Sequence, residues 1–123
     1  MDITKFSRRK THEVRIGEVR IGSDYPIAVQ SMTNTPTANV EASVAQTERI
    51  AAAGAAIVRL TAQGRKEGEN LENIVREVRQ SGYPTAIVAD IHFVPEVAAI
   101  AARYVDKVRI NPGNYRTTDR RLE

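Results

Sequence analysis

Arginine, aspartate, histidine and asparagine lie toward the carboxyl ends of three segments that have the apolar composition of buried β-strands. These segments are Ile57–Thr61, Ala86–Phe93 and Lys107–Asn114. Successive side chains on a strand point to opposite faces, so residues two positions apart share a face. Because parallel α/β sheets bind ligands at the carboxyl ends of their strands, the pattern predicts half of an active site. The polar residues that share a face are Arg59 with Thr61, Asp90 with His92, and Arg109 with Asn111.

The two arginines suit an anionic ligand. A guanidinium group is permanently charged, and its planar fork of N–H donors matches the oxygens of a phosphate group. Arg59 and Arg109 are therefore candidate phosphate-binding residues. The structural alternative is that each arginine only neutralises the carboxylate of Asp90 inside the fold.

The other polar residues offer weaker donors and acceptors. His92 could hydrogen-bond a phosphate or a substrate hydroxyl or pass a proton, and Asp90 could orient it or bind a hydroxyl itself. We favour binding over proton transfer, so no catalytic residue is assigned. Asn111 can contact a diphosphate or brace the Asn-Pro-Gly-Asn turn that it begins. Gln30 and Ser31, at the end of an earlier strand, either line the pocket or brace a loop.

Strands and helices alternate along the chain. Val14–Gly22 predicts a β-hairpin around Gly17, of the kind that often closes the bottom of a barrel. Three helices are expected from apolar spacing and capping residues. The predicted order after the hairpin is a core strand at 27–30, a helix at 39–53, a strand at 56–61, a polar loop at 62–68, a helix from Asn70 to Gly82, a strand from Ala86, a helix from Pro95 that buries Val97, Ile100, Ala101 and Tyr104, and a strand at 107–111.

This alternation predicts an α/β fold with parallel strands. An open doubly wound sheet would share the pattern. The amino-terminal half of a TIM (β/α)8 barrel, preceded by the short hairpin, is favoured because every strand carries polar groups at its end. The loop 31–37 also lacks the glycine fingerprint of dinucleotide-binding folds.

Composition narrows the class of protein. The chain has 123 residues, no cysteine and a formal net charge of +3, so it can form no disulfide and offers no thiolate ligand for a metal. The apolar run at 50–58 is too short to span a bilayer, and no secretory signal is evident, which makes the cytoplasm the default location. Basic segments at 7–10 and 116–121 permit RNA binding, but aromatic residues are only 5% of the chain, so nucleic acid is an unlikely partner.

Several motifs together resemble one enzyme family. They are Pro26–Thr35, Ile57–Leu60, Ala89–Phe93 and Val108–Asn114, and Val19–Gly22 fits as well. In this order and spacing they resemble the amino-terminal part of the 4-hydroxy-3-methylbut-2-en-1-yl diphosphate synthases. The resemblance covers nearly the whole chain after Ser7.

The resemblance implies an oxidoreductase of non-mevalonate (MEP pathway) isoprenoid biosynthesis. Such enzymes open the ring of 2-C-methyl-D-erythritol 2,4-cyclodiphosphate by two-electron reduction at a 4Fe-4S cluster, with electrons from flavodoxin or ferredoxin. It also implies that a TIM barrel binds the cyclodiphosphate and that a separate carboxyl-terminal domain carries the cluster. The substrate-binding residues would be Arg59, Asp90, His92, Arg109 and Asn111, with Gln30 and Ser31 as further candidates.

On this reading residues 1–10 form a flexible tail and residues 11–123 form a partial barrel that lacks the iron–sulfur domain. The chain alone should bind no cluster and be inactive. Two unpaired sheet edges should make it self-associate, so a homo-oligomer is expected. A different phosphate-binding barrel, such as a dihydropteroate-synthase-like transferase, and a nonenzymatic anion- or RNA-binding module are the alternatives.

Overall fold

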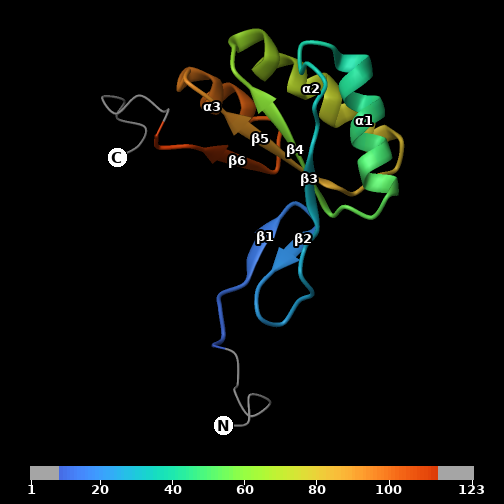
Figure 1. Cartoon of the computed structure of the whole chain (residues 1–123), viewed down its shortest axis with the longest axis vertical. Helices are drawn as coiled ribbons and strands as arrows, with labels where there is room; N and C mark the ends of the chain where they lie inside the picture. The colour runs from blue at the N-terminus through green and yellow to red at the C-terminus, as the bar shows by residue number, and fades with distance from the viewer. Residues whose placement is uncertain (1–8, 114–123) are drawn as a thin grey trace.

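The computed structural model describes residues 9–113. Two sheets are present, a two-stranded hairpin and a four-stranded sheet, and three helices lie along one side of the larger sheet (Figure 1). The first eight residues of the predicted tail and the basic segment 116–121 lie outside the described residues. The elements are β1 (Val14–Ile16), β2 (Val19–Ile21), β3 (Gln30–Met32), α1 (Val40–Ala52), β4 (Ile57–Ala62), α2 (Arg65–Gln80), β5 (Ala86–Ile91), α3 (Glu96–Ala101) and β6 (Lys107–Ile110).

The larger sheet is parallel throughout, with strand order β3-β4-β5-β6. Sequential strands are thus neighbours, and each is joined to the next by a helix on the same side (Figure 1). A barrel requires this simple order, whereas a doubly wound sheet reverses its strand order and has helices on both faces. The partial TIM barrel predicted from the sequence is confirmed.

The main core lies between the sheet and the helices. Val58, Leu60, Ile87 and Ile91 face the helices and are fully buried. They pack against the apolar stripes of α2 and α3, which include Leu71, Ile74, Val78 and Val97. Burial of each such side chain contributes about 1.5–3 kcal/mol. This layer holds the strands in register and so fixes where the polar side chains on the opposite face lie.

The hairpin covers the lower part of that opposite face. Ile16 of β1 is only 3% exposed and packs with Ile57, Ala86 and Val88 near the amino ends of β4 and β5. Gly17, at φ +59, makes the tight turn between β1 and β2. The predicted hairpin and its place at the bottom of the barrel are confirmed. Apolar packing there leaves only the carboxyl half of the inner face for polar groups.

Helix α2 begins earlier than the sequence suggested. The prediction of a loop at 62–68 followed by an Asn70 cap is wrong, because α2 starts at Arg65 with Gly64 as its N-cap. Gly68 is buried inside the first turns, where an added Cβ would lie 3.0 Å from Val97 Cγ1. This glycine allows α2 and α3 to approach each other and is not a loop residue. Asn70 instead donates through Nδ2 to the carbonyl of Ala38.

Strand β3 also differs from its prediction. The predicted strand is present but begins three residues later, at Gln30, and its description as a core strand is wrong, since β3 spans Gln30–Met32 and is exposed along its whole length. Ile27 and Val29 are 87% and 59% exposed, because β3 is an edge strand and pairs only with β4 in the described part of the chain. The other correction concerns α3, which ends at Ala101, so Tyr104 follows the helix and is only half-buried.

The start of α1 follows its predicted chemistry. Asn39 is the N-cap, and its side-chain oxygen accepts a hydrogen bond from the backbone N–H of Ala42 at 3.1 Å. Pro95 is the N-cap of α3, so the helix starts at Glu96, one residue after its predicted start. No helix within residues 9–113 is long and apolar enough to cross a membrane.

Candidate functional site

Asp90 lies at the centre of the polar end of the sheet. It belongs to β5, which has β4 on one side and β6 on the other, and its register partners are Thr61 and Arg109. The carboxylate side chain is only 2% exposed. Burying a carboxylate is costly unless charged or hydrogen-bonding groups surround it. The sequence supplies these groups from all three strands.

Two arginines and a histidine converge on this carboxylate. Arg109 Nη1 donates a hydrogen bond of 2.9 Å to Asp90 Oδ1. Arg59 Nε and His92 Nε2 each lie 3.3 Å from Asp90 Oδ2. The contact of Arg59 Nε is one of charge and not a hydrogen bond, because its geometry leaves that N–H without an acceptor. We call Arg59, Asp90, His92 and Arg109 the Asp90 cluster.

The cluster carries more positive charge than Asp90 neutralises. Two guanidinium groups face one carboxylate, so the net charge is +1 even with neutral His92. Arg59 and Arg109 keep 25% and 38% of their side-chain surface exposed. Each guanidinium has five N–H donors, and within the described residues Asp90 and Met32 occupy only some of them. The remaining donors and the surplus charge suit an anion.

Asn111 lies just after β6 and has a local partner. Its Oδ1 accepts a hydrogen bond of 3.0 Å from the backbone N–H of Gly113. This contact matches the structural alternative considered for Asn111, in which it braces the Asn-Pro-Gly-Asn turn. The amide can still present its N–H₂ donors at this end of the sheet, two residues beyond Arg109.

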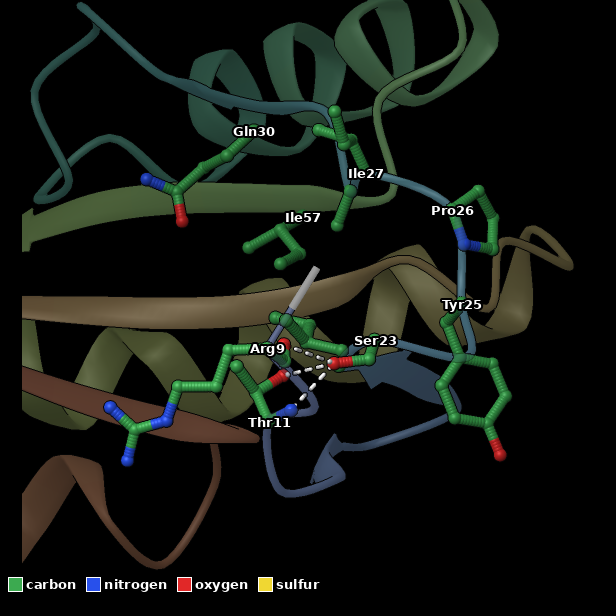
Figure 2. A pocket seen from close by; sticks show the side chains of 11 residues that line it. Arg9, Thr11, Ser23, Tyr25, Pro26, Ile27, Gln30 and Ile57 are labelled. Carbon is green, nitrogen blue, oxygen red and sulfur yellow. Dashed lines mark hydrogen bonds between the residues drawn. The ribbon is translucent and has the colours of Figure 1, made fainter. Parts of the chain in front are cut away.

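Gln30 and Ser31 are not brought to the cluster. Ser31 pairs with Val58, whose side chain belongs to the helix-side core, so Ser31 lies on the face opposite to Asp90. Gln30 shares the inner face with Arg59 but lies one layer lower, level with Ile57. It lines an open cavity of about 540 Å³ beside the hairpin (Figure 2).

That cavity is mostly apolar and has no residue of the Asp90 cluster. Ile21, Ile27 and Ile57 contribute to its walls. Its polar rim is held by Ser23, whose hydroxyl contacts the backbone and side chain of Thr11 and the carbonyl of Arg9 (Figure 2). The cluster and this cavity are therefore at different ends of the sheet.

A comparison with protein families now decides what kind of barrel this is. The model of the GcpE TIM-barrel domain matches residues 11–123. The chain belongs to this family. The match agrees with the parallel sheet, the hairpin and the motifs that suggested the resemblance, and it decides against a dihydropteroate-synthase-like barrel.

Three similar curated proteins carry the same enzyme name. A protein of Bacteroides fragilis named "4-hydroxy-3-methylbut-2-en-1-yl diphosphate synthase (flavodoxin)" is 58% identical over 94% of this chain and 18% of its own length. Proteins with the same name from Phocaeicola vulgatus and Leptospira interrogans are 55% and 46% identical, over 94% and 89% of this chain. The chain spans about a fifth of the length of these relatives.

Sequence reasoning missed one neighbour of the cluster. The Sδ atom of Met32 lies 3.2 Å from Arg59 Nη2, so this side chain also orients the guanidinium. Met32 pairs with Arg59 across β3 and β4 and therefore shares its face. Alternation along the strand shows that Gln30 and Met32 share a face. The pairing of Met32 with Arg59 follows only from the register of β3 and β4.

Proposed function

We propose that the Asp90 cluster binds the diphosphate of 2-C-methyl-D-erythritol 2,4-cyclodiphosphate. The complete protein would be a 4-hydroxy-3-methylbut-2-en-1-yl diphosphate synthase, an oxidoreductase of isoprenoid biosynthesis. One observation carries this proposal: Arg59, His92 and Arg109 surround a single buried carboxylate at the carboxyl ends of parallel strands. The enzyme name that the relatives share supports the choice of diphosphate.

Each residue has a distinct role in this proposal. Arg59 and Arg109 donate to phosphate oxygens, and their charge offsets that of the ligand. Asp90 holds both guanidinium groups in place and reduces their mutual repulsion. His92 Nε2 faces Asp90 Oδ2, so the imidazole lies beside the proposed phosphate site and completes the cluster. Asn111 extends the site from the turn after β6.

The residues of this chain do not fit a 4Fe-4S cluster. The sequence has no cysteine, and the described residues contain no group of His, Cys, Asp or Glu that could hold a metal ion. In our proposal any cluster ligands belong to other parts of the complete protein. This chain supplies only substrate binding, and the 123-residue polypeptide by itself does not turn over the cyclodiphosphate.

The proposed partners follow from the same reading. Flavodoxin, which the names of the relatives contain, is the favoured electron donor over ferredoxin. We place the enzyme in the bacterial cytoplasm and expect a homo-oligomer. An RNA-binding role has little support, because aromatic residues are only 5% of the chain.

The test compares two arginine variants in the complete enzyme. Arg109→Ala removes one charged hydrogen-bond donor, worth about 1.5–3 kcal/mol, so the dissociation constant of the cyclodiphosphate should rise about 10- to 100-fold. Calorimetric titration measures it, and thermal stability should fall by less than binding does, because Arg59 still faces the carboxylate of Asp90. Arg103→Ala, at an exposed position after α3, is the matched control. A larger effect of Arg109→Ala on stability than on binding would return Arg109 to a purely structural role.

A further inference from the structure

Phe93 has an unusual backbone conformation beside the Asp90 cluster. Its φ is +65°, and it is the single non-glycine residue with positive φ in residues 9–113. The backbone N–H of Val94 donates to the carbonyl of His92 at 2.7 Å, which closes a γ-turn with Phe93 at its centre. This positive-φ form of the γ-turn is rare and strained for residues with a Cβ.

Burial does not offset this strain. The phenylalanine is 57% exposed, so much of its ring contributes nothing to the core. Glycine would adopt the same backbone at lower cost, and it would expose no apolar surface. Within the described residues, burial therefore gives no reason for a phenylalanine here. Strained backbone of this kind persists where it serves a site.

The ring contacts the histidine of the cluster. The ring centroids of Phe93 and His92 are 5.9 Å apart, with an angle of 43° between the planes. The backbone of His92 is held as well, because its N–H donates to the carbonyl of Ala62 at 3.4 Å. The imidazole thus has the phenyl ring on one side and Asp90 Oδ2 within 3.3 Å of Nε2. Rotation of the imidazole away from Asp90 would disturb both contacts.

We propose that Phe93 is a positioning residue, and that its strained turn holds the imidazole of His92 in the Asp90 cluster, with Nε2 against Asp90 Oδ2. The contact between the two rings supports the orientation of the His92 imidazole. The expected effect on anion binding rests on the proposed diphosphate-binding function. Because the imidazole contributes to the proposed anion site only while it stays in the cluster, loss of the ring weakens anion binding although Phe93 itself need not touch the anion.

Histidine NMR on the 123-residue chain tests the geometry. The chain has two histidines, so imidazole-labelled protein gives two sets of ring signals, and His12→Gln assigns them. We expect Phe93→Ala to move the His92 signals and leave those of His12 in place. Phe93→Tyr, which keeps an aromatic ring, should restore them. Val14→Ala, at a similarly exposed apolar residue in β1, is the control and should move neither set.

A titration with inorganic pyrophosphate tests the consequence. Loss of a well-placed imidazole from the site of a charged ligand should raise the dissociation constant about tenfold in Phe93→Ala, and Phe93→Tyr should recover wild-type affinity. Phe93→Gly removes the ring but can keep the turn, so it distinguishes the effect of the ring from the effect of the strained backbone. It relieves the positive φ, so it should melt at a higher temperature than Phe93→Ala, yet bind pyrophosphate as weakly.

The proposal is overturned if Phe93→Ala leaves the His92 signals unchanged, or if Phe93→Gly keeps full affinity. The NMR result does not depend on the identity of the ligand. Failure of the wild-type chain and the complete enzyme to bind pyrophosphate or the cyclodiphosphate would reject the proposed function, while the His92 signals would still decide whether Phe93 positions the imidazole.

Discussion

Arg109 and Asp90 are direct register partners on β6 and β5, and Arg109 Nη1 donates to Asp90 Oδ1 at 2.9 Å. Arg59 reaches the same carboxylate from β4, one layer lower, since the partner of Asp90 on that strand is Thr61. The two guanidinium groups therefore approach from opposite sides. Asp90 is the common anchor of the cluster, and this arrangement predicts opposite effects on stability and anion binding when its charge is removed.

Asp90→Asn should destabilise the fold and strengthen pyrophosphate binding. Removing one partner of a buried ion pair costs about 3–5 kcal/mol in the free energy of unfolding. We expect the lower value, about 3 kcal/mol, because the side chains of Arg59 and Arg109 are 25% and 38% exposed. The same change raises the net charge of the cluster by one, which favours an anion. Urea unfolding and calorimetric titration measure the two effects. Asp24→Asn, at an exposed residue, is the control, and weaker pyrophosphate binding by Asp90→Asn would show that Asp90 serves the ligand directly.

Asp106→Asn should lower stability without changing anion binding. Asp106 Oδ2 accepts from Arg79 Nη2 at 2.7 Å and from the backbone N–H of Ile87 at 2.8 Å. It thereby joins the end of α2 to the start of β5. We expect a loss of about 1–3 kcal/mol in the free energy of unfolding, measured with urea. Glu72→Gln on the exposed side of α2 should change it little. A large change in pyrophosphate affinity would contradict this purely structural role.

Gly68→Ala should destabilise the chain, although alanine normally stabilises a helix. The general gain from this replacement is about 0.5–1 kcal/mol. Here the new Cβ would lie 3.0 Å from Val97 Cγ1 and 3.4 Å from Ile100 Cγ2. Val97 is fully buried and β-branched, so it cannot easily move. We expect a net loss of about 1 kcal/mol by thermal or urea unfolding, and a net gain would mean that α3 shifts to accept the methyl group.

Ile27→Lys should reduce self-association of the 123-residue chain. Strand β3 forms one edge of the sheet, and the preceding Ile27 is 87% exposed. Exposed apolar edges pair with other chains, and lysine at such an edge blocks this pairing. Light scattering across a range of protein concentrations should show oligomers for the wild type and fewer for the variant. Ala45→Lys, on the exposed side of α1, adds the same charge elsewhere. A wild-type chain that stays monomeric at high concentration would contradict the prediction.

Helix boundaries show where sequence reasoning reached its limit. The apolar spacing of α2 from Leu71 onward was visible in the sequence, but the charged residues Arg65–Glu67 and Gly68 resembled a loop. Their helical conformation depends on a close contact between Gly68 and α3. The same limit applies to β3, whose apolar residues predicted a core strand but lie exposed at an edge of the sheet.

The sequence by itself determined which polar residues share a face, because alternation along a strand is a property of the local backbone. That is why Arg59, Asp90, His92 and Arg109 could be grouped before any coordinates. Only the tertiary structure decided that Asp90 is the centre of the group, that Ser31 faces away, and that Phe93 adopts a positive φ beside His92. These facts depend on strand order, register and packing, which arise from contacts between residues far apart in the chain.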